Sequence, residues 1–249
     1  MLDLRNTVQP SPASRYHLSL AVDDSEIREA QRLRYQVFAE EMGARLSSAL
    51  PKHDTDLYDP FCDHLLVREL ASGEVVGTYR ILPPDAARRV GSYYSEQEFD
   101  LTRLNFLRPR MAELGRSCVH PAHRSGAVIA RLWMGLADYM TRYGYEYIVG
   151  CASIGMADGG HIAARVHRQL SERHLAPIEW HAAPRYRLPV ESLDDGQRAA
   201  LPPLIKGYTR LGAMMCGEPA WDPDFNTADL LMLLPMAQLN RSYARRLIA

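Results

Sequence analysis

Charged side chains occur inside segments that are otherwise apolar, and such positions can hold a substrate or move a proton. Glu113-Leu114-Gly115-Arg116 puts two opposite charges into a strand that we expect to be buried, and Arg80 lies in another apolar strand. Residues three apart in a regular strand face opposite sides, but Gly115 would permit a β-bulge that turns Glu113 and Arg116 toward one cleft. Desolvation would suit Glu113 to be a general base. The alternative is a structural ion pair of Glu113 and Arg116, with each other or with Arg80.

An aspartate-rich stretch lies in segment 44–61, which shows little periodicity. It contains Asp54, Asp56 and Asp59, and Asp63 follows just beyond it. The spacing does not match an EF-hand calcium loop, which needs a central glycine and a distal glutamate. Two interpretations remain open: a solvated loop, or a carboxylate cluster that grips a cationic or amino substrate.

Arg34 is a cation on a stripe of a helix that should face the core. The helix is expected to start at an N-cap among residues 23–25 and to run to about Met42, with Val37 and Phe38 on the same stripe. A buried cation needs a partner or a ligand. The alternative is that Arg34 extends along the surface to reach an exposed carboxylate.

The turn Arg124-Ser125-Gly126 precedes the helix that the sequence predicts most clearly, at Gly126–Tyr143, where apolar residues recur at intervals of three and four. We expect the flanking strands, Met111–Val119 and Tyr147–Ser153, to be buried, parallel and joined by this helix. The first turn of such a helix offers free backbone N–H groups and the positive end of the helix dipole. The turn could therefore bind a phosphate-bearing ligand.

Composition narrows the classes of protein. The net charge of the 249 residues is −1, which gives no general attraction to nucleic acid. No apolar run is long enough to span a membrane, and the N-terminus lacks the apolar segment of a signal peptide. We therefore expect a cytoplasmic protein.

The cysteines Cys62, Cys118, Cys151 and Cys216 are far apart, so we expect reduced thiols. A zinc site at Cys118, His120 and His123 would lack an evident fourth ligand. We predict no metal and no permanently bound cofactor.

The remaining segments complete an alternation of strands and helices. We expect a first strand at 16–22, a hairpin of 64–69 and 75–82, a basic helix at 160–174, a proline-started helix after Leu201, and a last strand at 227–234. The basic helix could bind an acidic partner or could be a solvated face. We expect one domain at 16–235, a loose tail at 1–15, and an amphipathic helix at 236–249.

This order of elements resembles the GNAT acyltransferase fold: α/β, with a mixed, mostly antiparallel central sheet flanked by helices, here with a C-terminal extension. Two bacterial branches that use acyl carrier protein are more similar still. The scattered signature of the N-acyl-homoserine lactone synthases matches Arg34, Phe38, Asp56, Asp59, Arg80, Glu113 and Arg116.

The second branch, the ornithine N-acyltransferases of ornithine-lipid synthesis (sometimes labelled hemolysin-like), matches more densely and over most of the chain. Its motifs are similar to 34–38, 40–42, 58–60, 62–65, 76–80, 94–95, 98–100, 113–119, 132–133, 150–153, 201–207 and 211–213. The sequence departs from acetyl-CoA-dependent GNAT enzymes at the donor turn, where only Gly126 is available. It also departs from the expected proline-bearing loop at 155–160.

The resemblance implies an N-acyltransferase that moves a 3-hydroxy fatty acyl group from acyl carrier protein to the α-amine of ornithine or a similar amino acid. The product would be a lyso-ornithine-type lipid, and the enzyme could associate peripherally with the inner face of the membrane. Glu113 would be the base. The implied substrate-binding residues are Asp56 and Asp59 for cationic groups, Arg34, Arg80 and Arg116 for the carboxylate, and Phe38.

The implied donor site consists of Val119, whose backbone region would polarise the thioester, and of Arg124, Ser125 and Gly126. The donor would be a phosphopantetheine-linked acyl group, on acyl carrier protein rather than on CoA. The alternatives are an N-acyl-homoserine lactone synthase and an acetyl-CoA-dependent amine N-acetyltransferase. A membrane-lytic protein fits poorly, because charges lie inside the predicted strands.

Overall fold

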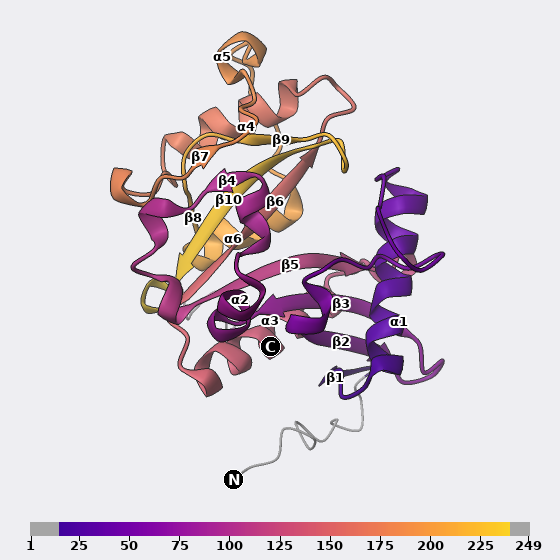
Figure 1. The fold of residues 1–249 in the computed structure, drawn as a ribbon. Coiled ribbons are helices and arrows are strands. Elements are labelled where there is room, and N and C mark those ends of the chain that lie inside the picture. Colours follow the sequence, from indigo (N-terminus) through magenta and orange to yellow (C-terminus); the bar gives the residue numbers. More distant parts are fainter. Residues whose placement is uncertain (1–14, 240–249) are drawn as a thin grey trace. The chain divides into compact units, whose positions relative to one another are not determined.

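The computed structural model describes residues 15–239 (Figure 1). They form two compact units. The first unit comprises 15–82 and 114–144, and the second comprises 83–113 and 145–239. Strand β5 (Met111–Val119) begins in the second unit and ends in the first. The expected tail at 1–15 and helix at 236–249 lie outside the described residues, except for Arg15 and the stretch 236–239.

In the first unit, the strands of the sheet lie in the order β1-β2-β3-β5, and β2 pairs antiparallel with both β1 and β3. The predicted hairpin of β2 and β3 is confirmed, with its turn at residues 70–74. The elements of this unit besides β5 are β1 (Tyr16–Leu20), α1 (Asp24–Tyr35), η2 (Gln36–Glu41), η3 (Asp59–Phe61), β2 (Asp63–Glu69), β3 (Val75–Leu82), η7 (Pro121–His123) and α3 (Ala127–Tyr143).

The alternation of side chains along β2 and β3 assigns the two helices to opposite faces of the sheet. His64 and Arg80 are register partners on one face, where Arg80 bonds the loop that also bonds α1. Leu65 is on the other face, and its side chain lies 3.2 Å from the Cβ position of Gly135 in α3. Because residues i and i+2 share a face, the polar residues of β3 point to the α1 side while the apolar core lies under α3.

Local signals explain the limits of these helices. The Asp23 side chain caps α1 by accepting from the backbone N–H groups of Ser25 and Glu26, at 2.9 and 3.0 Å. α3 ends at Gly144, whose φ of +68° is costly for other residues. The helix predicted to reach Met42 is α-helical only to Tyr35, and then continues as a wider π-helical segment, Gln36–Glu41.

In the second unit, β10 is the central strand and is buried along its whole length. It pairs antiparallel with β6, β8 and β9, and the start of β5 pairs parallel with β6, as the sequence predicted. The strands here are β4 (Phe99–Asp100), β6 (Tyr147–Gly155), β7 (Ala183–Pro184), β8 (Met214–Met215), β9 (Ala220–Asp222) and β10 (Thr227–Pro235). The helices and turns are α2 (Pro84–Val90), η4 (Tyr94–Gln97), η5 (Thr102–Leu104), η6 (Arg108–Arg110), α4 (His161–Ser171), η8 (Ile178–Trp180), α5 (Val190–Leu193), α6 (Pro203–Leu211) and η9 (Met236–Gln238).

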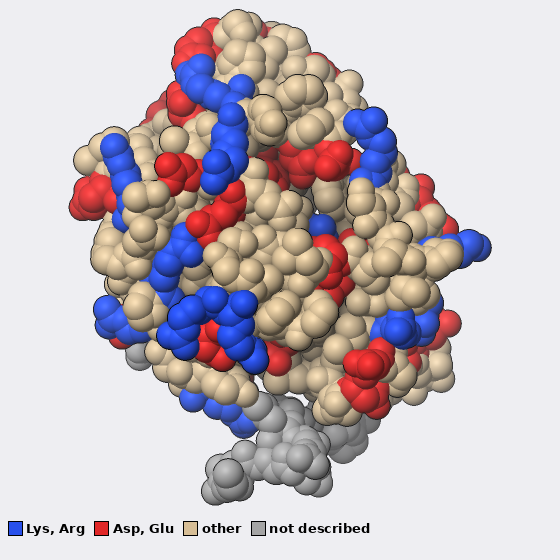
Figure 2. Space-filling view, in the orientation of Figure 1, with Lys and Arg blue, Asp and Glu red and all other residues tan. Residues whose placement is uncertain are grey.

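Charges on the surface are mixed in sign. Figure 2 shows acidic and basic side chains interspersed over one face, in agreement with the net charge of −1. Within residues 15–239, every helix is too short or too polar to cross a membrane.

Gly77 tests the packing of α3 on β3. A Cβ atom there would lie 2.4 Å from Cγ1 of Val128, a fully buried side chain of α3. We expect Gly77→Ala to lower the free energy of unfolding by about 1–3 kcal/mol, because a packed core has no room for the added methyl. Denaturant unfolding measures the change. Gly155→Ala is the control, since a Cβ at that strand position meets nothing within 4 Å; equal losses in both variants would contradict the packing argument.

Candidate active site

Three arginines and three aspartates, here called the Arg–Asp cluster, meet in the first unit. Arg34 comes from α1, Arg80 from β3 and Arg116 from β5. The aspartates, all from the loop between η2 and β2, are Asp54, Asp56 and Asp59. The structure therefore brings together every charged residue that we predicted for substrate binding, and adds Asp54.

Arg34 is the most deeply buried member, with no exposed surface. Its Nε donates to Oδ2 of Asp54 at 2.8 Å, and its two terminal nitrogens donate to the two oxygens of Asp59 at 3.0 and 2.8 Å. One of these nitrogens also donates to the backbone carbonyl of Asp54. Arg34 therefore does not extend to a surface carboxylate, and it fixes the aspartate-rich loop against α1.

Arg80 and Arg116 complete the cluster from the sheet. Nη1 of Arg80 donates to both oxygens of Asp56, each at 2.7 Å, and to Oδ1 of Asp59 at 2.9 Å. Nε of Arg116 donates to Oδ2 of Asp54 at 3.0 Å, and its Nη2 lies 3.6 Å from Oδ2 of Asp56. The aspartates that we expected to hold substrate cations thus bind the chain's own arginines.

The backbone of β5 departs from regular strand geometry at Arg116 rather than at Gly115. Arg116 has a φ of +52°, in the left-handed region that residues other than glycine rarely adopt. The departure predicted at Gly115 is therefore one residue further along. The conformation is held in place by the bond of the Arg116 guanidinium to buried Asp54.

Burial and charge set the protonation of the cluster. Burial alone would raise the pKa of Asp59, but the adjacent Arg34 and Arg80 outweigh it and hold the pKa well below its usual range. His64 behaves oppositely: burial, reinforced by Arg34, lowers its pKa to about 4. Its Nε2 lies 3.3 Å from the carbonyl of Asp59 and its Nδ1 is unpartnered among the described residues, so His64 is neutral at pH 7.

The accessible edge of the cluster consists of Asp56 and Arg116, whose side chains are 20% and 11% exposed. The other predicted substrate residue, Phe38, is partly buried and packs against a small apolar group of Leu33, Val37 and Cys118. A ligand approaching from solvent would meet Asp56 and Arg116 first, with Arg34, Arg80 and Asp59 behind them.

In the predicted donor turn, the backbone N–H groups are accessible, whereas the arginine is already bonded to other residues of the chain. Gly126 has a φ of +100°, no side chain caps α3, and a Cβ at Gly126 would meet nothing within 4 Å. The first N–H groups of α3 therefore have no intrahelical acceptor. Arg124, however, donates to both oxygens of Glu41, at 2.5 and 2.7 Å, and to the carbonyl of Val119 at 3.0 Å. Ser125 is exposed.

Glu113, the predicted base, lies in the second unit and is 4% exposed. Its carboxylate accepts from the backbone N–H groups of Tyr94 and Ser95, at 2.6 and 2.8 Å, and from the Ser95 hydroxyl. These three donors fix the orientation of the Glu113 carboxylate.

The sequence analysis missed a second group of acids in the second unit. Oxygens of Glu98 and Asp229 and the sulfur of Cys151 all lie within 4.8 Å of one another, the only such trio of possible metal ligands in residues 15–239. Asp222 is near enough to disturb Glu98 electrostatically. Asp229 does carry a signal in the sequence, because it is a carboxylate within the apolar run 227–234.

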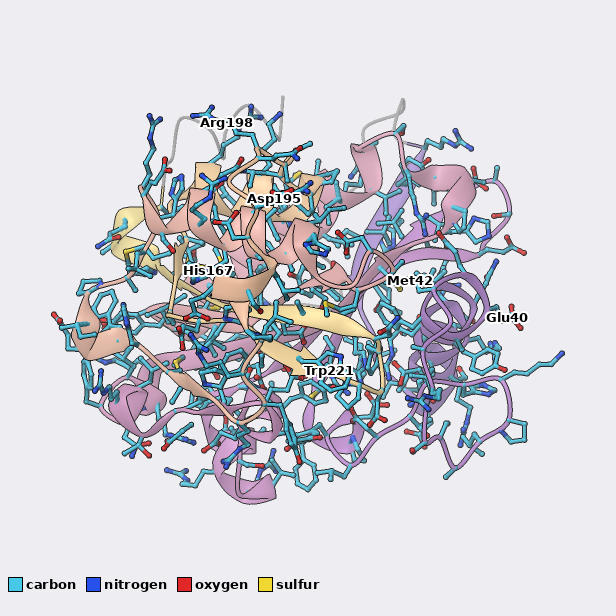
Figure 3. The ribbon with its side chains drawn as sticks, turned by 90° about the horizontal axis from the view of Figure 1, so that it is seen from above. Glu40, Met42, His167, Asp195, Arg198 and Trp221 are labelled. Carbon is cyan, nitrogen blue, oxygen red and sulfur yellow. The ribbon has the colours of Figure 1, made fainter. Side chains whose placement is uncertain are left out.

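Cys118, His120 and His123, the possible zinc ligands of the sequence analysis, are not among the ligand groups that converge in residues 15–239. On α4, Arg165 pairs with Asp195, and Arg168 pairs with Asp194. Figure 3 shows Asp195 beside this helix. The basic face is thus largely neutralised by the chain itself.

Comparisons with known proteins agree with this architecture. A family model described as an acetyltransferase (GNAT) domain matches residues 33–134. The L-ornithine N(alpha)-acyltransferase of Rhizobium meliloti (strain 1021) is 38% identical over 244 residues, covering 90% of this chain and 81% of that protein. The enzyme of the same name from Rhodobacter capsulatus is 39% identical over 252 residues, covering 93% and 95%.

Two solved structures share the fold. The AHL synthase LasI has a TM-score of 0.53 at 16% identity, covering 92% of this chain and 96% of that chain. FeeM, an N-acyl amino acid synthase from uncultured soil microbes, has a TM-score of 0.52 at 14% identity, with the same coverage of 92% and 96%. At such identities the likeness is one of fold.

The GNAT domain and the mixed, mostly antiparallel α/β architecture define the protein as an acyltransferase of the GNAT class. The similarity to the curated relatives extends over nine tenths of the chain and is well above the level of shared fold. The chain belongs to the L-ornithine N(alpha)-acyltransferase family.

The low pKa of His64 makes stability depend on pH in a defined window. Between pH 6.5 and 4 the unfolded chain binds a proton that the folded chain does not, so the free energy of unfolding falls as the pH is lowered. His64 should contribute about 3 kcal/mol to this fall. The free energy of unfolding, measured by denaturant unfolding at several pH values in this window, should therefore depend less steeply on pH in His64→Gln than in the parent. The control is His17→Gln, on outer strand β1; a slope unchanged by His64→Gln would rule out the assignment.

Proposed function

We propose that the protein transfers a 3-hydroxy fatty acyl group from acyl carrier protein to the α-amine of ornithine or a similar amino acid. The observation that carries the proposal is the similarity to enzymes named L-ornithine N(alpha)-acyltransferase, which spans most of both chains. The product would be a lyso-ornithine-type lipid. Such a product partitions into membranes, which suits a cytoplasmic enzyme that associates peripherally with the inner membrane face.

The proposed reaction needs a base at the amine and donors at the thioester. The α-ammonium first loses one proton to solvent, and the neutral α-amine then attacks the thioester carbonyl. Glu113 accepts the second proton, which the nitrogen loses as the C–N bond forms. The negative charge that develops on the carbonyl oxygen would be stabilised by backbone N–H groups near Val119. The carbonyl then re-forms as the C–S bond breaks, and the phosphopantetheine thiolate leaves and takes up the proton held by Glu113, which restores the base. None of these steps needs a metal or a nucleophilic cysteine.

The Arg–Asp cluster supports binding of the α-amino acid group at its accessible edge. Arg116 offers a guanidinium for the carboxylate and Asp56 offers a carboxylate for the ammonium, so the edge suits a zwitterion. Arg34, Arg80 and Asp59 would hold that edge in position. Arg34 bonds Asp54 and Asp59, and Arg80 bonds Asp56. Phe38 would contribute apolar contact.

The donor site would be the first turn of α3. Its uncapped N–H groups suit the phosphate of phosphopantetheine, and Gly126 lets the ligand approach the backbone closely. Arg124 would reach the phosphate by exchanging its exposed partner Glu41, while Ser125 would donate its hydroxyl. A turn with a single glycine supports a carrier-protein donor over CoA, because CoA-dependent GNAT turns are glycine-rich.

Product analysis tests the reaction. The protein is incubated with 3-hydroxyacyl carrier protein and a mixture of amino acids, and products are identified by mass spectrometry. We expect acyl-ornithine with release of free carrier protein, and at least about tenfold slower reaction with the matching acyl-CoA. Carrier protein without an acyl group is the control. A lactone formed from S-adenosylmethionine, or acetylation from acetyl-CoA alone, would overturn the proposal.

The role of Glu113 is tested by Glu113→Gln, which removes the basic oxygen but keeps the size of the side chain. We expect kcat to fall at least about a hundredfold while the variant stays folded, because amine attack loses its proton acceptor. The matched control is Glu146→Gln, since Glu146 is an exposed carboxylate paired with Arg110 in the same unit. Turnover near the parent value in Glu113→Gln would remove this residue from the role of base.

A further inference from the structure

The carboxyl groups of Glu98 and Asp229 lie on the same sheet face as Glu113. In register, Glu113 on β5 is opposite Val149 on β6, and Ser153, two positions beyond Cys151, is opposite Asp229 on β10. Residues i and i+2 of a strand share a face, so Glu113, Cys151 and Asp229 all point to one side. Strands β6 and β10 are paired side by side (Figure 1). Glu98 directly precedes β4 and directs its carboxyl group to this side.

These acids have no basic partner among the described residues, unlike the aspartates of the Arg–Asp cluster. Asp229 accepts from the hydroxyl of Thr227 at 3.0 Å. Glu98 is 8% exposed, and its Oε2 points at Asp229 and Cys151 and accepts from no N–H group in residues 15–239. Without a ligand, two adjacent buried carboxyl groups are tolerated only when they share a proton, so the arrangement points to a ligand that donates hydrogen bonds and replaces that proton.

Glu98 holds a proton at neutral pH, so the two buried carboxyl groups do not carry two negative charges at once. Burial and the adjacent Asp229 raise the pKa of Glu98 to about 10, and burial raises the pKa of Asp222 as well. The groups that face Glu98 are Asp229, Asp222 and the thiol of Cys151, with Ser95 and Glu113 adjoining that thiol. Without a ligand, a proton on Glu98 supplies the missing positive charge.

We propose that Glu98 and Asp229 bind the side-chain ammonium of the acceptor amino acid. This inference rests on the proposed function, which supplies an acceptor with a second amine. An ammonium group has three N–H donors and fits acceptors that converge within 4.8 Å.

The arrangement would choose which amine reacts. The side-chain nitrogen held between two carboxyl groups stays protonated, so it has no lone pair for attack on the thioester. The α-amine, at the other end of a short methylene chain, would then be directed to Glu113 on the same sheet face. Ser153, the register partner of Asp229, is exposed.

The first test compares ornithine with norvaline, which has the same carbon chain but no side-chain amine. The parent should show a kcat/KM at least about a hundredfold higher for ornithine, because norvaline leaves the buried carboxyl groups unpaired. In Glu98→Gln and Asp229→Asn this ratio should fall at least about tenfold through the KM for ornithine, while Glu146→Gln keeps the parent ratio. An unchanged ratio in folded Glu98→Gln and Asp229→Asn would overturn the inference.

A second measurement uses the unmodified protein, in case these variants do not fold. Ornithine binding should displace the proton of Glu98, so calorimetry in buffers of different ionisation enthalpy should show about one more proton released per ornithine than per norvaline. Equal release would overturn the inference. Loss of the ornithine preference on treatment with EDTA would do so too, by assigning the trio to a metal. A parent enzyme that acylates no amino acid would instead defeat the proposed function.

Discussion

The first unit depends on the pairing of buried Arg34 with Asp54 and Asp59. A guanidinium with no exposed surface is tolerable only when its donors are bonded, and here the carboxylates come from a loop with little regular structure. The same aspartates bond Arg80 and Arg116, so one network ties α1, β3 and β5 to that loop. Removing one member would leave an unpaired buried charge at a cost of about 3–5 kcal/mol. The network also holds Arg116 in its left-handed conformation.

In the second unit, buried carboxyl groups are stabilised differently from the aspartates of the Arg–Asp cluster. Glu113 accepts hydrogen bonds from neutral donors, two of them backbone N–H groups, which fix the orientation of its carboxylate. Glu98 and Asp229 have neither arginine nor lysine among the described residues to neutralise them, and a proton takes that place. Charge that is balanced internally builds a rigid scaffold, whereas charge that is left unbalanced in a buried setting is available to a ligand.

The sequence predicted the elements better than the contacts. Apolar periodicity located α3, the β2–β3 hairpin and the parallel pairing of β5 with β6, because these patterns are local. The π-helical segment after α1 was missed, and so was the left-handed Arg116, whose conformation depends on a contact distant in sequence: Arg116 and Asp54 are 62 positions apart. Resemblance to a family grouped the charged residues of the first unit, but no local pattern joins Glu98 to Asp229.

A balance of charge distinguishes the roles of the two groups of acids. An α-amino acid with a basic side chain carries two ammonium groups and one carboxylate, a net charge of +1. The Arg–Asp cluster carries three formal charges of each sign and so adds no net charge. Under the proposal, the second ammonium is balanced within the second unit, where Glu98 would lose its proton beside Asp229. An acceptor without that ammonium would leave the buried acids unpaired, so the proposed preference for a basic amino acid would follow from the cost of desolvated carboxyl groups.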